Sequence, residues 1–512
     1  MSVCSVLFGS EADRLSAEPL GADLPFFRDL NLDQVIGGIA ANKTEYDLRP
    51  FFHAPLHDVA AVTFRHEVFR DLEDARLLSD LSHFADSMRA VREQLGQLAK
   101  RHYEHQKESW FLDAVGLYGD AIKRLVHDLA ASGIRSRGIL AFKKYLEQYG
   151  ASRHFTALAD ETKRLKAALA AIRCTVFIDG GHVEVRRYGG EANYSREVVE
   201  TFERFQQGTV KEYAFAFSDA PEMNHIEAQI LDGVAHLNRD TFSELASYRS
   251  GNKDFLDPTI AAFDREIQFY LGYLDYIAPL RHAGLQFCYP RVSTSRKEVY
   301  NSDGFDLALA SKLASEHSRP VCNDFHLRDR ERIIVVSGPN QGGKTTFARS
   351  FGQLHYLASL GCPVPGSRAQ LYLPDRVLTH FEREERMTSL RGKLEDDVVR
   401  IHEILIAATP RSIIIINEIF ASTALRDAVC LSKKVAAGLM DLGVLCVWVT
   451  FIDEVASLAE QTVSMVSTVA PDNPAQRTFK IMRRPADGLA YAMALAEKYG
   501  LTCEKILERV GP

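Results

Sequence analysis

A glycine-rich loop between a predicted strand and a predicted helix limits the folds open to this 512-residue chain. Residues 331–337 read ERIIVVS, and such a run of branched apolar residues is typical of a buried strand. The next residues, 338–346, read GPNQGGKTT and meet the phosphate-loop pattern GxxxxGK(S/T), and helical periodicity begins directly after them. This order of strand, loop and helix predicts a nucleotide-binding α/β domain.

The residue types of this loop suit the binding of phosphate. Glycine at positions 338, 342 and 343 lets backbone N–H groups turn toward an anion where a Cβ would obstruct the turn. The helix that opens at Lys344 points the positive end of its dipole at the same anion. We expect Lys344 to reach the β- and γ-phosphate oxygens of ATP, and the Thr345 hydroxyl to bind Mg²⁺. The predicted ATP-binding residues are Gly338, Pro339, Asn340, Gln341, Gly342, Gly343, Lys344, Thr345 and Thr346.

A second predicted strand, RSIIIINEIF, carries two polar residues where a phosphate-loop ATPase has a metal-associated Asp and a catalytic Glu. The first of these positions is Asn417, whose amide oxygen orients a metal-bound water without carrying charge, so we expect weaker Mg²⁺ binding. The second is Glu418, which is expected to polarise the attacking water as general base. We therefore predict Glu418 and Lys344 as catalytic residues and slow ATP hydrolysis, with binding without turnover as the alternative.

The apolar pattern predicts a mixed fold. Between about residues 77 and 277, apolar residues recur at alternating spacings of three and four, which indicates long helices packed in coiled-coil fashion. The period changes at 174–190, where alternation around Asp179-Gly180-Gly181 predicts a hairpin. After about residue 290, short buried runs alternate with helices, and VLCVWVTFI is a third such strand. We predict a long-helical core and lever region with a small β-containing insert, followed by an α/β phosphate-loop (ABC-type) domain whose parallel sheet is covered on both faces.

Composition excludes several classes of protein. An apolar fraction of 46% and a charged fraction of 25% are ordinary for a globular chain, and a net charge of −7 gives no general attraction to nucleic acid. The 8 cysteines are scattered without a CxxC pair, which favours free thiols in a reducing compartment over disulfides. The sequence shows neither a signal-peptide pattern nor an apolar run long enough to cross a bilayer. These features predict a cytoplasmic protein with no membrane partner.

Several motifs are similar to those of one family. GPNQGGKTT is close to the form GPNxGGKST, and NEIFASTALRDAV is similar to DEIGRGTSTYDGL, with Thr423 and Asp427 on matching positions. Further matches are the stretches 320–324, 361–365 and 488–501. Over about 300–510 the chain thus resembles the ATPase domain of the MutS family of DNA mismatch-repair proteins. The likeness is weaker over 31–290, where helical core, levers and insert have the order of that family's core and clamp domains.

The resemblance implies a domain order and partners. It implies ATP bound between the two subunits of a homodimer, with Mg²⁺, and DNA bound without sequence specificity in repair or recombination. The implied division begins with a lead-in over 1–30, which we read as loose because it lacks periodicity. It continues with a helical core and lever over 31–173, a clamp-like insert over 174–222 and a returning lever over 223–290. An ATPase domain with a C-terminal helical dimerisation element covers 291–512. We expect no mismatch-recognition or connector domain.

Two departures from the family bear on the active site. The family loop that reaches the partner subunit's γ-phosphate aligns with Gly392-Lys393, so Lys393 either supplies a charge in trans or is a surface lysine. The switch histidine that follows the third strand is replaced by Phe451. No imidazole is therefore expected to sense the γ-phosphate.

Charge gives mixed evidence for a DNA surface. Residues 86–173 hold 16 Lys and Arg against 10 Asp and Glu, which suits phosphate contact or merely the solvated faces of helices. The insert 174–222 has 5 basic and 9 acidic residues, and Arg186 and Arg187 are its candidate phosphate contacts. Two alternatives to a DNA-binding ATPase therefore stay open. One is a regulatory ATPase whose levers grip a protein partner, and the other is a catalytically dead, nucleotide-gated binder.

Overall fold

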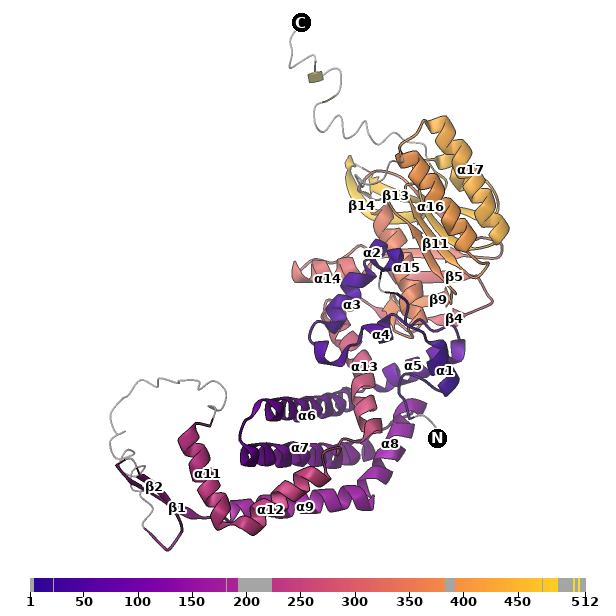
Figure 1. Ribbon diagram of the computed structural model, residues 1–512. Helices are drawn as coiled ribbons and strands as arrows, with labels where there is room; N and C mark the ends of the chain where they lie inside the picture. The colour runs from indigo at the N-terminus through magenta and orange to yellow at the C-terminus, as the bar shows by residue number, and fades with distance from the viewer. Residues whose placement is uncertain are drawn as a thin grey trace. The chain divides into compact units, whose positions relative to one another are not determined.

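The computed structural model describes residues 4–21, 23–180, 182–191, 223–382, 392–471, 473–486, 501 and 505–506 (Figure 1). The chain divides into two compact units. Unit 1 contains residues 1–78, 133–142 and 262–512, and unit 2 contains residues 79–132 and 143–261. The prediction of a mixed helical and β-sheet fold is confirmed, whereas the five-part division of the chain stays a prediction.

Unit 1 is built on a mainly parallel sheet. Within the described residues its order is β10–β11–β12–β7–β13–β14; β14 is antiparallel to β13, and the other neighbours are parallel. The strands are β7 (Ile333–Ser337), β10 (Val377–His380), β11 (Ile413–Asn417), β12 (Leu445–Val449), β13 (Thr462–Ala470) and β14 (Asn473–Arg483). Every residue of β7, β11 and β12 is buried, which confirms the three strands predicted from apolar runs.

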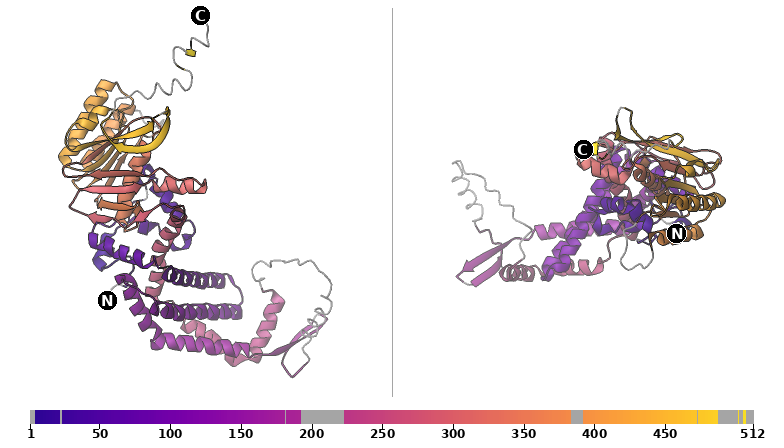
Figure 2. Two further views of the ribbon diagram at one scale, coloured as in Figure 1. Left: turned by 180° about the vertical axis from the view of Figure 1, so that it is seen from behind. Right: turned by 90° about the horizontal axis from the view of Figure 1, so that it is seen from above.

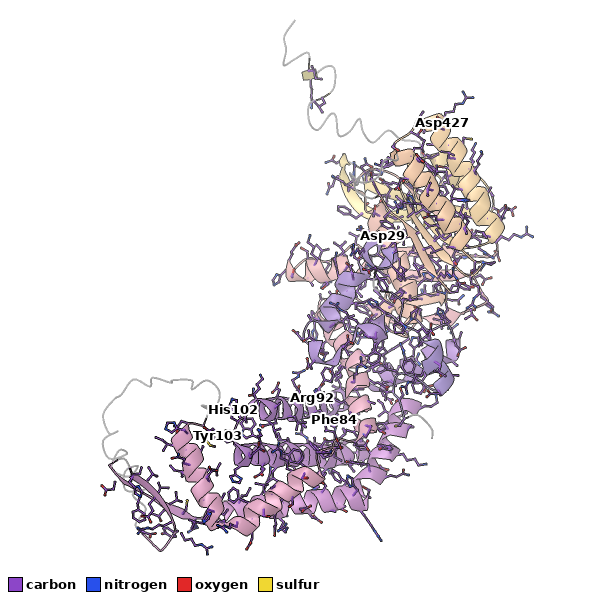
Figure 3. All side chains as sticks on the ribbon, in the orientation of Figure 1. Asp29, Phe84, Arg92, His102, Tyr103 and Asp427 are labelled. Atoms are coloured by element: carbon purple, nitrogen blue, oxygen red, sulfur yellow. The ribbon has the colours of Figure 1, made fainter. Side chains whose placement is uncertain are left out.

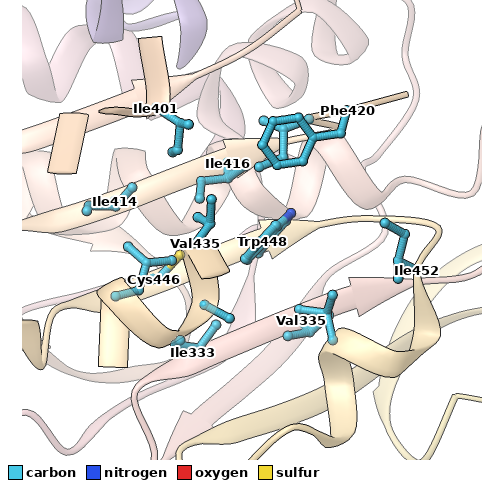
Figure 4. Packing of buried hydrophobic residues seen from close by; sticks show 14 of the residues in the cluster. Ile333, Val335, Ile401, Ile414, Ile416, Phe420, Val435, Cys446, Trp448 and Ile452 are labelled. Atoms are coloured by element: carbon cyan, nitrogen blue, oxygen red, sulfur yellow. The ribbon is translucent and has the colours of Figure 1, made fainter. Parts of the chain in front are cut away.

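Helices cover both faces of this sheet. The covering helices are α15 (Lys344–Ser359), α16 (Lys393–Ala407) and α17 (Leu425–Leu442). On one face Ile414 and Ile416 pack in a cluster with Ile401 of α16 and Val435 of α17 (Figure 4). Ile415 points to the opposite face, toward α15, because successive residues of a strand alternate between faces. The predicted two-sided burial of the sheet is confirmed.

Smaller elements complete the later part of unit 1. A second sheet has the order β4–β9–β5–β6 within the described residues, and β3 pairs with β8. These elements are β3 (Phe287–Cys288), β4 (Arg291–Ser293), β5 (Val299–Gly304), α14 (Leu307–Ser315), β6 (Asn323–Leu327), β8 (Val364–Pro365), β9 (Arg368–Tyr372) and η2 (Asp453–Ser457). The amide of Gln353 in α15 donates to the backbone oxygen of Leu30 and to Asp306. This buried side chain ties the N-terminal segment and the start of α14 to α15.

The N-terminal segment of unit 1 is packed, so the expectation of a loose lead-in over 1–30 is wrong for its described residues. Its elements and those that follow are α1 (Glu11–Ser16), α2 (Pro25–Asp29), α3 (Leu32–Ala40), η1 (Thr44–Tyr46), α4 (Arg49–Phe52) and α5 (Val59–Asp71). Val6 and Phe27 are buried, and the Tyr270 hydroxyl donates to the Val6 carbonyl oxygen over 2.5 Å. Apolar residues without periodicity give no local signal, and their burial depends on distant partners.

Unit 2 is mainly helical. Its elements are α7 (Glu104–Ala130), α9 (Arg153–Ala170), β1 (Cys174–Asp179), β2 (His182–Arg187), α11 (His225–Leu237) and α12 (Arg239–Gly251), with parts of α6 (Ala75–Lys100), α8 (Arg137–Gly150) and α13 (Pro258–His282) (Figure 2). The apolar stripe of α7 from Phe111 to Leu129 is buried. Thr162 of α9 shares a hydrogen bond with Tyr248 of α12 over 2.5 Å. Strands β1 and β2 pair antiparallel, as the hairpin pattern predicts. The use of these helices as levers stays a prediction.

Two further expectations concern the described residues. Of the 8 cysteines in the sequence, Cys503 lies outside the described residues. The others are free thiols. None of the described helices combines the length and the apolar character needed to span a membrane.

Candidate nucleotide site

The loop between β7 and α15 has a backbone that requires glycine. Gly338 and Gly343 have φ of +113° and +89°, in a region that disfavours side chains. Gly342 is needed for space, because a Cβ there would lie 2.2 Å from the Ser467 hydroxyl of β13. That hydroxyl donates to the Gly342 carbonyl over 2.6 Å. Strand β13 thus contacts and supports the loop through Ser467, and the neighbouring strand β7 leads directly into the loop.

Lys344 begins α15 and is almost wholly buried. Its Nζ donates to the carbonyl oxygens of Gly338 and Pro339, at 3.0 and 3.1 Å, which directs the ammonium across the loop. The Phe451 ring lies over it, with Nζ 4.4 Å from the ring centroid, a distance suited to a cation–π interaction. Burial lowers the pKa of Lys344, and the Glu418 carboxylate raises it. Phe451, which stands where the family has its switch histidine, therefore lies against the phosphate-loop lysine.

Thr345 and Asn417 meet although they are 72 residues apart. The Thr345 hydroxyl donates to the Asn417 amide oxygen over 2.9 Å. Both lie at the same edge of the sheet, because α15 follows the carboxyl end of β7 and Asn417 ends the parallel strand β11. These two oxygens are hard ligands of the kind that Mg²⁺ prefers, and they fit a magnesium site that lacks a carboxylate. Mg²⁺ held there would supply positive charge to offset the charge of phosphate groups.

Glu418 directly follows β11 in a left-handed backbone conformation, with φ of +57°. Its N–H donates to the Val449 carbonyl of β12 over 3.0 Å, which anchors this turn to the sheet. Burial raises the pKa of Glu418, and the Lys344 ammonium lowers it. Glu418 lines a pocket of about 530 Å³ whose wall also includes residues 340–346.

The structure therefore brings the predicted site residues together. Residues 340–346 and Glu418 line the pocket. Gly338 and Pro339 are connected to the pocket through their hydrogen bonds with Lys344, and Asn417 is connected to it through its hydrogen bond with Thr345. Their roles in binding and catalysis stay predictions.

Part of the pocket wall was missed by sequence reasoning. Arg477 of β14 donates through Nε to the Asn340 carbonyl over 3.1 Å, and Phe479 of the same strand lines the pocket. Asn323 holds Phe479 by donating from its side-chain amide to the Phe479 carbonyl over 3.1 Å. The apolar lining also includes Phe305, Leu309, Leu313, Val321 and Phe325. Of these residues, Val321 and Asn323 lie in the stretch 320–324 that was noted from the sequence, and no local pattern marks the residues of β14.

Other predicted residues lie away from this pocket. Lys393 is paired with Glu382, and neither of these two described residues lines the pocket. Asp427 lies in the first turn of α17 (Figure 3), and neither it nor Thr423, both described, is part of the pocket wall. The predicted dimerisation element falls almost wholly outside the described residues.

The candidate phosphate contacts of the insert already have partners within unit 2. Arg186 forms a bidentate pair with Glu184, at 2.8 and 2.6 Å, and its guanidinium lies 4.9 Å from the Phe177 ring centroid. Arg187 donates to the Leu237 carbonyl over 2.7 Å. A phosphate would have to compete with these contacts.

Comparison with known proteins identifies relatives of this chain. Residues 334–508 match the family described as MutS domain V. The DNA mismatch repair protein MutS of Thermotoga neapolitana is 25% identical over 284 residues, which are 54% of this chain and 33% of the relative. The protein of the same name from Chloroflexus aurantiacus is 25% identical over 374 residues, 70% of this chain and 36% of the relative. The chain thus spans about a third of the length of the curated relatives it matches. The predicted family resemblance is confirmed.

Proposed function

We propose that this chain, a relative of the MutS proteins through its ATPase domain, binds ATP with Mg²⁺, hydrolyses it slowly and uses it to control binding to DNA. The observation that carries the proposal is the convergence of Lys344, Thr345 with Asn417, and Glu418 on one pocket beside the phosphate loop. These groups supply a cation for phosphate, oxygen ligands for Mg²⁺ and a carboxylate for water activation.

The proposed chemistry assigns one task to each part of the pocket. Backbone N–H groups at the start of α15 and the Lys344 ammonium bind the phosphates, because the first turn of a helix leaves its N–H groups without intrahelical acceptors. The apolar wall with Phe305 and Phe479 accommodates the base. Glu418 accepts the proton of the attacking water, and its raised pKa makes it a better base than an exposed glutamate.

The proposed partners are those that the family relationship suggests. Two relatives are named DNA mismatch repair proteins, and we propose DNA bound through its backbone, a homodimer that shares its nucleotide sites, and a cytoplasmic location. In this scheme ATP binding closes the dimer and moves the helices of unit 2, and hydrolysis reverses the movement. Repair or recombination is the proposed setting.

Steady-state ATP hydrolysis tests the proposal directly. The purified protein is assayed alone and with duplex, mismatched and branched DNA, and the Lys344→Ala variant provides the blank. Turnover that changes with one form of DNA supports a DNA-responsive ATPase. Turnover that no DNA changes, together with DNA binding that lacks a steep salt dependence, contradicts the DNA part of the proposal.

A protein-gripping ATPase is the second candidate. It is favoured by the hairpin of unit 2, where Arg186 and Arg187 are engaged internally while apolar side chains are exposed, including Ile178 at 71% of its surface. Exposed apolar side chains suit a protein surface better than a phosphate backbone. Loss of DNA binding on substituting Arg186 and Arg187 together would count against this candidate.

The third candidate, a nucleotide-gated binder without turnover, makes a different prediction. It predicts that the unsubstituted protein hydrolyses ATP no faster than the Lys344→Ala blank. Glu418→Gln would then leave the hydrolysis rate unchanged at that same level. ATP binding would still be lost in Lys344→Ala. A measurable rate that falls in Glu418→Gln excludes this candidate.

A further inference from the structure

A buried carboxylate on α16 connects two segments near the nucleotide pocket. Asp397 is buried, and its Oδ1 lies 3.4 Å from Nε2 of His380, the last residue of β10, which is also buried. Three residues farther along α16, Arg400 donates from both terminal nitrogens to the Phe381 carbonyl, each over 3.1 Å. One side of α16 therefore holds the end of β10.

The other carboxylate oxygen of Asp397 reaches the turn that carries Glu418. Asp397 Oδ2 accepts a hydrogen bond of 3.2 Å from the backbone N–H of Phe420. Phe420 is buried and has φ of +61°, and Glu418 has φ of +57°. Two non-glycine residues in this region within three positions store backbone strain, which persists only where surrounding contacts hold it. Asp397 provides such a contact from outside the turn.

The same end of β10 is also tied to the phosphate-loop helix. Arg349 of α15 donates through Nε to the Asp29 carbonyl over 2.9 Å, and its guanidinium lies 5.6 Å from the Phe381 ring centroid. The carboxylate of Asp29, which is labelled in Figure 3, accepts a hydrogen bond of 2.6 Å from the Thr379 hydroxyl. The helix that begins with Lys344 and the turn that begins with Glu418 thus share one anchor, the end of β10.

We propose that Asp397 is a positioning residue for ATP hydrolysis, which holds the turn after β11 so that the Glu418 carboxylate faces the pocket. This inference rests on the proposed role of Glu418 as general base. A carboxylate suits the task because a charged acceptor forms a stronger hydrogen bond to a backbone N–H than a neutral one. Without it, the buried Phe420 N–H loses its acceptor and the strained turn loses a restraint.

Substitution of Asp397 tests the proposal through turnover and nucleotide affinity measured separately. Asp397→Leu keeps the branch at Cγ and removes both oxygens but is bulkier, while Asp397→Ser adds no bulk and is too short to reach both His380 and Phe420. We expect kcat to fall on the order of 10- to 100-fold in both variants, because small displacements of a catalytic group have effects of this size. The Kd for ATP is expected to stay within about twofold, since Asp397 does not line the pocket formed by the described residues. Asp397→Asn keeps an acceptor oxygen and is expected to recover most of the rate.

The matched control is Asp396→Ala, which removes the same charge from the neighbouring, half-exposed position of α16. Thermal unfolding and ATP binding establish that each variant is folded. Retention of the unsubstituted kcat in folded Asp397→Leu or Asp397→Ser overturns the proposal. An equal loss of kcat in Asp396→Ala also overturns the proposal, because the effect would then follow from removing a negative charge from α16 and not from the contacts of Asp397.

A double-mutant cycle separates this inference from the proposed function. If Asp397 acts through Glu418, adding Asp397→Leu to Glu418→Gln lowers the residual rate no further. A further drop of the same size as in the single variant overturns the positioning role while leaving Glu418 as the base. An unchanged rate in Glu418→Gln alone overturns the role of Glu418, and the inference about Asp397 with it.

Discussion

Replacing Asn417 by aspartate should strengthen the magnesium site. The Asn417 amide oxygen accepts the Thr345 hydroxyl over 2.9 Å, and a carboxylate oxygen of nearly the same shape can accept it equally well. The substitution therefore changes charge with little change in volume. The new charge would stand next to the position where Thr345 is proposed to bind Mg²⁺.

The expected gain follows from two opposing contributions. A carboxylate about 4 Å from a divalent cation, with one water between them, gains on the order of 8 kcal/mol at an effective dielectric constant of about 20. Asn417 is only 8% exposed, so placing a charge there costs several kcal/mol of desolvation. The net gain in binding free energy, which is the small difference between these two contributions, agrees with the 10- to 100-fold changes in metal affinity that are typical of groups next to metal ligands.

The assay is ATP hydrolysis measured against Mg²⁺ concentration. In Asn417→Asp the half-saturating Mg²⁺ concentration is expected to fall about 10- to 100-fold, while ATP binding without metal is unchanged or slightly weaker. Asn417→Ser is the matched control, because it offers a neutral oxygen and should show no gain. An unchanged half-saturation in a folded Asn417→Asp variant would refute the assignment of Asn417 to the metal site.

Further substitutions test the pH dependence and the packing of unit 1. Because burial raises the pKa of Glu418, kcat should begin to fall at a higher pH on acidification than an ordinary glutamate would require, and Glu418→Gln should abolish this limb of the profile. Burial lowers the pKa of His355 from 6.5 to about 4, so the unfolded chain binds the extra proton between these values. Stability should therefore decrease as the pH falls, with a contribution of about 2 kcal/mol from this residue between pH 7 and pH 5. Urea unfolding of His355→Gln at both pH values should show that contribution missing. Gly352→Ala should destabilise unit 1 by about 1–3 kcal/mol, because the new Cβ would lie 2.7 Å from the Leu30 side chain. Gly438→Ala, with its nearest side-chain atom at 3.7 Å, should be neutral or stabilising in the same unfolding assay.

Local signals along the chain predicted the nucleotide-binding half of unit 1 well. The loop at 338–346 was recognisable because its motif consists of consecutive residues. Each of the three buried strands was recognisable from a short apolar run. Asn417 and Glu418 were recognisable because they end one of these strands. Parallel strands place their carboxyl ends at one edge of a sheet, so the meeting of Thr345 with Asn417 follows from these elements and the sheet topology.

Contacts between distant segments were not recognisable in the same way. Phe479 and Ser467 reach the phosphate loop only because β13 and β14 extend the sheet beside β7, and neither residue belongs to a motif. Asp397 is one of two adjacent aspartates on α16, and its role as acceptor for the Phe420 N–H depends on how that helix packs against the turn. Val6, in the lead-in expected to be loose, is buried against Tyr270 for the same reason. Periodicity and motifs report what a residue does within its own helix, strand or loop, whereas burial and hydrogen bonding between elements depend on the packing of the whole unit.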